Sequence, residues 1–132
     1  MRIISICKNI DEFIGNGLKW GRKLPNDIIK KFEGKDIRVV FDNYPCIQKK
    51  RDGEDFNEYW NRVGGYQEKE AVINSPKTFG DILKPYVENI INIITGIESG
   101  TLKDWEYNHY YNCLWAERFV FDGDSVKIEI GS

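Results

Sequence analysis

A stripe of apolar residues at helical spacing, between residues 79 and 97, limits the folds open to this chain more than any other feature. Its members recur every three or four positions, which is the period of an α-helix with one buried face. The stripe consists of Phe79, Ile82, Leu83, Tyr86, Val87, Ile90, Ile91, Ile94 and Ile97. Because such a helix must cover its apolar face, the rest of the chain has to supply a broad apolar surface.

Pro85 lies inside this helical pattern. Proline removes a backbone donor and its ring clashes with the preceding turn, so it breaks or kinks a helix. We therefore expect a short turn over residues 78–84 and a main helix over residues 86–98. Thr78 and Asp81 have the spacing of a capping box, which marks the start of the pattern.

The C-terminal third has the residue composition of a β-sheet, and this helix could pack on such a sheet. Residues 105–121 are rich in Tyr, Trp, Phe and Val, the residue types that favour strands. Val126, Ile128 and Ile130 then alternate with polar residues, which is the pattern of a half-buried strand. Asp122-Gly123, between the two segments, is a hairpin turn signal.

We expect the strands of this sheet to cover residues 114–121 and 125–130, with a break near Asn112, because strands usually span ~5–6 residues. The main helix should pack on them through Val87, Ile90, Ile91 and Ile94. Earlier patterns predict strands over 2–7, 36–42 and 66–74, and helices over 9–14, 25–33 and 54–63. This order of elements predicts a single α+β domain over residues 1–132, with a long central helix packed on a mainly antiparallel C-terminal sheet.

Charge is distributed unevenly along the 132 residues, although the formal net charge is only −2. The chain up to Arg51 holds twelve basic and six acidic residues, whereas the remainder holds seven basic and fifteen acidic residues. A protein that binds the phosphates of nucleic acid needs a clustered excess of Lys and Arg, so the net charge of −2 disfavours that role. The two parts could pair within the fold, or they could face different partners.

No motif in the sequence names a reaction, so we expect neither an enzyme nor a cofactor. The single histidine, His109, lacks any flanking catalytic signature. The three cysteines, Cys7, Cys46 and Cys113, have neither the count nor the spacing of a disulfide framework or a zinc site, so we expect buried free thiols and no metal. A small enzyme or ligand-binding α+β domain, with an aromatic-lined pocket that includes His109, is the alternative interpretation.

We predict a cytoplasmic protein that does not enter a membrane. No window approaches the ~20 apolar residues that a membrane-spanning helix needs. The N-terminal apolar stretch is too short for a signal sequence and is not followed by a cleavage-like pattern. An odd number of widely spaced cysteines is typical of a reducing compartment.

Carboxylates and exposed aromatic residues in the acidic part are the candidate partner-binding groups. One cluster lies at the start of the 54–63 helix, in which Phe56, Tyr59, Trp60 and Val63 recur on one face. Acidic residues also stabilise a first helical turn without any partner, so this cluster has a structural explanation as well. The candidates are Asp52, Glu54, Asp55, Glu58, Asp104, Glu106, Tyr110 and Tyr111.

The segments Trp105–Tyr111 and Arg118–Asp124 are aromatic and acidic. Together with the small size and the absence of catalytic signatures, they resemble the immunity proteins of bacterial polymorphic-toxin and contact-dependent growth-inhibition systems. The resemblance implies a protein that binds one cognate toxin, often a nuclease, and covers its active site or substrate surface. The excess of acidic residues after Arg51 leads us to expect a basic protein partner rather than nucleic acid. A second location for a partner, which would then be acidic, is the basic segment with Arg22, Lys23, Lys30, Lys31 and Lys49 to Arg51.

Overall fold

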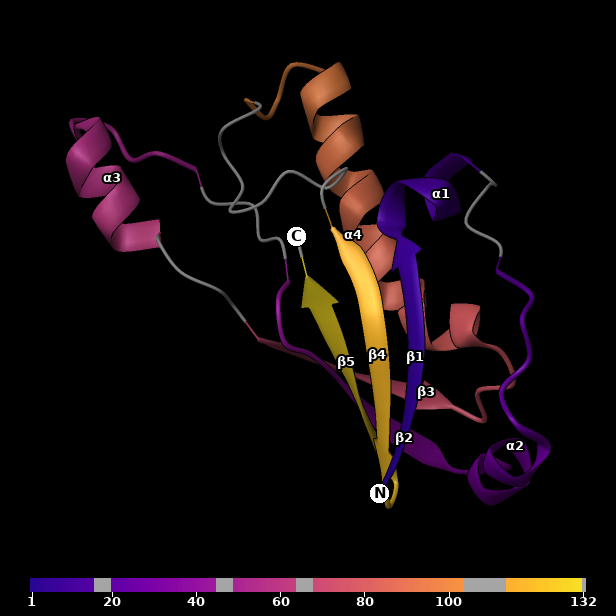
Figure 1. The fold of residues 1–132 in the computed structure, drawn as a ribbon. Coiled ribbons are helices and arrows are strands. Elements are labelled where there is room, and N and C mark those ends of the chain that lie inside the picture. Colours follow the sequence, from indigo (N-terminus) through magenta and orange to yellow (C-terminus); the bar gives the residue numbers. More distant parts are fainter. Residues whose placement is uncertain (16–19, 45–48, 64–67, 104–113, 132) are drawn as a thin grey trace.

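A computed structural model describes residues 1–15, 20–44, 49–63, 68–103 and 114–131 of the chain. Within them, five strands form one sheet in the order β1-β4-β5-β2-β3 (Figure 1). The parallel pair is β2 with β5, and the other neighbours are antiparallel. The strands are β1 (Arg2–Asn9), β2 (Asp36–Phe41), β3 (Lys69–Asn74), β4 (Trp115–Asp122) and β5 (Ser125–Gly131).

The predicted C-terminal hairpin is present. Asp122 pairs with Ser125 across a two-residue turn, and Gly123 has a φ of 59°, which explains the glycine there. The sheet is not confined to the C-terminal third, because β1 pairs with β4 and β2 pairs with β5. The break expected near Asn112 lies outside the described residues. An irregularity in pairing with β5 occurs instead within β4, between Ala116 and Arg118.

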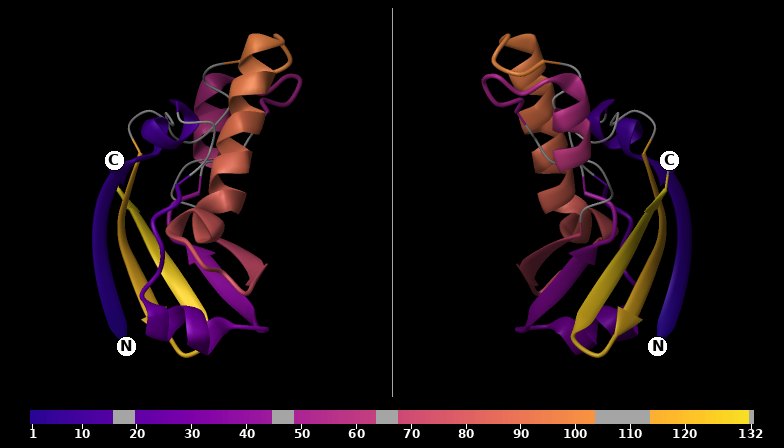
Figure 2. Two further views of the ribbon diagram at one scale, coloured as in Figure 1. Left: turned by 90° about the vertical axis from the view of Figure 1, so that its right-hand side faces the viewer. Right: turned by 90° about the vertical axis from the view of Figure 1, so that its left-hand side faces the viewer.

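Alternation along the strands builds a core on one face of the sheet. Helices α1 (Ile10–Gly15), α2 (Asn26–Phe32) and α4 (Phe79–Glu98) contribute to this core. In Figure 2 the strands and α4 lie in separate layers. The strand residues in the core are Ile37, Val39, Phe41, Ala116, Phe119, Phe121, Val126, Ile128 and Ile130. This arrangement confirms the predicted α+β class, with a long helix packed on a mainly antiparallel sheet.

The opposite face of the sheet carries charged side chains. Arg38 on β2 pairs with Glu70 on β3, and Arg118 on β4 pairs with Glu129 on β5. These ion pairs are cross-strand contacts between exposed or half-buried groups, so they fit a face turned toward solvent. Cys7 is also exposed, with a φ of 50° at an irregularity in β1, and this contradicts the buried thiol expected there.

The expectation that Pro85 would separate a short turn from the main helix is wrong, because α4 continues through it from Phe79 to Glu98. Thr78 and Asp81 form the predicted capping box, with Asp81 N donating to Thr78 Oγ1 at 3.0 Å and Thr78 N donating to Asp81 Oδ2 at 3.1 Å. The first turn is also anchored by buried Phe79 and Ile82. These contacts offset the cost of an internal proline, which is about 3 kcal/mol.

The residues through which α4 packs on the core agree only partly with the predicted stripe. Val87 and Ile90 are buried in the main core, whereas Ile91 and Ile94 are half-buried against it. Ile93, which is not in the predicted stripe, is fully buried because Leu102 packs on it after the helix ends. Among the described residues, no helix is long and apolar enough to cross a membrane.

Candidate protein-binding surface on helix α3

Helix α3 (Phe56–Val63) lies to one side of the sheet (Figure 1). It begins two residues later than the sequence predicts, because Asp55 caps it. The Glu58 backbone N–H donates a hydrogen bond of 2.8 Å to Asp55 Oδ1, and the Tyr59 N–H donates to the Asp55 carbonyl at 2.9 Å. Asp55 therefore has a structural role in starting the helix, in addition to its place among the candidate binding residues.

The four apolar residues of α3 do not share one buried face, as the sequence suggests. Tyr59 and Val63 are buried, with exposed fractions of 1% and 5%, whereas Phe56 and Trp60 are 55% and 48% exposed. Each pair is spaced by four residues, so each forms its own row along the helix. The helix buries one row and leaves the aromatic row in solvent.

The exposed aromatic row has a defined geometry. The Trp60 ring meets the buried Tyr59 ring edge-to-face, with centroids 5.1 Å apart. The Lys50 Nζ lies 6.0 Å from the centroid of the Phe56 ring. An indole that packs on a buried ring loses little further freedom when a partner covers it, so the row is suited to be a contact.

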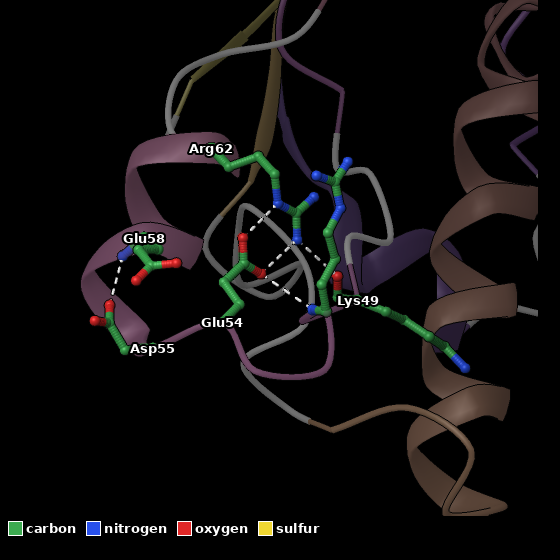
Figure 3. Close-up of polar contacts among 6 residues, drawn as sticks. Lys49, Glu54, Asp55, Glu58 and Arg62 are labelled. Carbon is green, nitrogen blue, oxygen red and sulfur yellow. Dashed lines mark hydrogen bonds and ion pairs between the residues drawn. The ribbon is translucent and has the colours of Figure 1, made fainter.

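The Glu54 carboxylate accepts hydrogen bonds from other residues of this chain (Figure 3). The Arg62 Nε and Nη2 donate to its two carboxylate oxygens at 2.8 and 2.9 Å, and the Arg51 N–H donates to it at 3.0 Å. Arg62 also donates to the Lys49 carbonyl at 2.9 Å. The hydrogen bonds from Arg62, followed by that from the Arg51 backbone, lower the pKa of Glu54 to about 2. The side chain is only 9% exposed, so little of it can meet a partner.

Asp52, Asp55 and Glu58 are exposed. The negative charge of the Asp55 carboxylate, and its hydrogen bonding with Glu58, raise the pKa of Glu58 above its usual value. A cation placed between the two carboxylates would relieve this repulsion. These three carboxylates are the members of the predicted cluster that a basic partner can reach.

The surroundings of α3 are less acidic than a division of the sequence at Arg51 suggests. Residues 49–62 contain four basic and four acidic residues, so their formal charge is zero. The structure joins Lys49, Arg51 and Arg62 to the same cluster as Glu54. We therefore regard the aromatic row as the centre of the surface and the carboxylates as its rim. The remaining candidates, Asp104, Glu106, Tyr110 and Tyr111, lie outside the described residues, as does His109.

A hollow of about 370 Å³ lies beside the start of α4. Trp20, Thr78 and Asp81 line it, and the Asp81 carboxylate accepts hydrogen bonds from the Lys77 and Thr78 backbone N–H groups. Its other charged residues, Lys84 and Glu88, pair with each other at 3.9 Å. No group of three or more metal-ligating side chains occurs within the part of the chain that the structure describes.

The α3 surface thus offers two exposed rings on one short helix, with three accessible carboxylates on or just before that helix. Tyrosine, tryptophan and arginine dominate the energetics of protein interfaces, and a rim of charge directs association. No protein-family model, curated protein or solved structure matches this chain.

The Glu54–Arg62 pair should make stability depend on pH in the acid range. The pKa of Glu54 is about 2 in the folded chain, against about 4.3 for an unperturbed glutamate. The stabilisation is therefore fully present above about pH 4.3 and is lost as the pH falls toward 2. Glu54→Gln should melt below the parent at pH 7, and the difference should shrink by pH 2.5.

Thermal melting at several pH values, with amide exchange of α3, measures this effect. Glu98→Gln is the control, because Glu98 is exposed and belongs to no ion pair found among the described residues. A melting difference for Glu54→Gln that is equally large at pH 7 and pH 2.5 would contradict the assignment.

Proposed function

We propose that this chain is an immunity-type protein that binds a cognate bacterial toxin and covers its active site or substrate surface. The observation that carries the proposal is the exposure of Phe56 and Trp60, one turn apart on α3. Two large rings held in solvent on a helix that buries its other apolar residues cost solvation energy in the free protein. A partner that covers them recovers this energy.

The carboxylates favour a partner with a basic surface. Asp52, Asp55 and Glu58 lie on or beside the helix that carries the rings. Nuclease sites that meet phosphates are rich in Lys and Arg, and complementary charge raises the association rate. Because residues 49–62 have a formal charge of zero, charge alone cannot supply most of the affinity. The exposed carboxylates direct the encounter, and the aromatic row supplies most of the affinity.

Binding kinetics with a toxin encoded beside this gene test the proposal. In the double variant Asp52→Lys/Glu58→Lys, association should slow by roughly tenfold at low salt, because repulsion replaces attraction. This difference should fade as ionic strength rises, since the Debye length falls to about 8 Å at 0.15 M. Asp55 is left unchanged so that the helix keeps its cap.

The matched control is Glu98→Lys/Asp122→Lys, which makes the same charge change at two exposed carboxylates outside α3. It should alter association much less. The charge-directed encounter with a basic partner is wrong if the two double variants associate at equal rates. The whole proposal fails if the purified chain neither binds nor inhibits the toxin.

A further inference from the structure

A second hollow, of about 570 Å³, lies away from α3 and brings together three lysines. Lys23 precedes α2, Lys30 is in the last turn of α2, and Lys77 precedes α4. An isolated bridge between Lys23 and Thr78 joins two of these segments, with the Leu24 N–H donating to the Lys77 carbonyl at 2.9 Å. The fold thus places Lys77 on the same hollow as Lys23 and Lys30, which lie much earlier in the sequence.

Positive charge in this hollow is largely uncompensated. The ion pairs found among the described residues include none of the three lysines. Glu33 is the carboxylate that lines the hollow. Of the nearby acids, Asp27 pairs with Arg2 at 2.7 Å, and Asp81 accepts hydrogen bonds from backbone N–H groups at the start of α4. Like charges that converge without partners repel, and an anion would offset this repulsion.

The hollow also contains neutral donors in fixed positions. Ser75 has a φ of 47°, which is unusual for a residue other than glycine, and its N–H donates to the Lys35 carbonyl at 2.9 Å. Its Oγ accepts from the Gly34 N–H at 2.6 Å, and Thr78 Oγ1 accepts from the Asp81 N–H at 3.0 Å. A hydroxyl that accepts one bond keeps its own O–H to donate to a ligand.

We propose that this hollow binds a soluble small molecule that carries linked phosphate groups. Lysine ammonium groups and hydroxyls are suitable donors to phosphate oxygens. The volume lies within the ~300–1,000 Å³ of small-molecule sites, and half-buried Ile29 supplies an apolar wall. The lysines surround one hollow in a chain of net charge −2, which favours a compact anion over a nucleic-acid strand. This site shares no residue with the α3 surface and stands apart from the proposed function.

Calorimetric titration with inorganic tripolyphosphate tests the site on the full chain. The parent should bind with a saturable isotherm near one ligand per chain. In the triple variant Lys23→Gln/Lys30→Gln/Lys77→Gln, affinity should fall by at least about tenfold, because three charge-assisted contacts are lost. The control triple, Lys49→Gln/Lys69→Gln/Lys127→Gln, removes the same charge from exposed lysines that do not line the hollow.

The control triple should change affinity by less than about threefold, which is the size expected from long-range charge alone. Circular dichroism of both triples confirms that each remains folded. The proposal is overturned if the parent shows no saturation at millimolar tripolyphosphate, or if the two triples weaken binding equally. The proposal would also be overturned if the chain does not bind tripolyphosphate but co-sediments with anionic phospholipid vesicles. That result would indicate a membrane surface as the ligand.

Discussion

Replacing Ile90 with aspartate should lower the free energy of unfolding by about 3–5 kcal/mol, which is the usual cost of an uncompensated buried charge. Ile90 is fully buried where α4 meets the sheet. A carboxylate there must remain charged without a partner or take up a proton, and either choice disfavours the folded state. Domains of ordinary stability hold only about 5–15 kcal/mol in total, so the variant should lose a large share of its stability and unfold at a much lower urea concentration than the parent.

Urea denaturation measures this loss, and Asn92→Asp provides the matched control. Asn92 is exposed on the same helix, so the same carboxylate is placed in solvent two residues away. Its effect should stay within about 0.5 kcal/mol, as is usual for surface changes. If Ile90→Asp and Asn92→Asp unfold at the same urea concentration, α4 does not pack on the sheet through this face.

The parts of the fold that follow from local pattern could be predicted from sequence. Ile37, Val39 and Phe41 alternate with polar residues and do face the core. The capping box at Thr78 was visible as a spacing, and the structure contains both of its hydrogen bonds. Periodicity predicts which residues of one helix or strand share a face, because backbone geometry alone determines this.

What depends on contacts between distant segments could not be predicted in the same way. The pairing of β2 with β5 joins residues about ninety positions apart, and no local pattern encodes it. Ile93 is buried because Leu102 folds back on it. Pro85 is tolerated because the first turn of α4 is held by a capping box and by buried side chains, which a rule about proline alone does not include.

The candidate surface shows the same limit. The sequence identifies α3 as a helix with four apolar residues, but it cannot tell which row meets the rest of the chain. A charge count divided at Arg51 also assigns Lys49 and Arg51 to the basic part of the chain. In the structure, hydrogen bonds join both residues to the cluster of Glu54 and Arg62. The lysine-lined hollow is invisible to any linear pattern, since Lys23 and Lys77 come together only through the bridge between their segments.

Trp60→Ala should weaken binding to the cognate toxin more than any other single change on α3. Buried interface tryptophans typically contribute 2 kcal/mol or more, so we expect a loss of affinity of about thirtyfold or greater. Stability should change little, since the indole is 48% exposed in the free chain. Phe56→Ala should act in the same direction with a smaller effect, because the Lys50 ammonium lies near its ring and must be displaced or shared.

Trp115→Ala is the matched control, because Trp115 is 41% exposed but belongs to strand β4 rather than to α3. Equilibrium affinity is measured for all three variants, with thermal melting to confirm that each is folded. Because Trp60 is held against buried Tyr59, its loss should appear mainly as faster dissociation, whereas the charge variants of the rim should mainly slow association. Equal affinity of Trp60→Ala and the parent would exclude α3 as the centre of the interface, and a loss confined to Trp115→Ala would move that centre to the sheet.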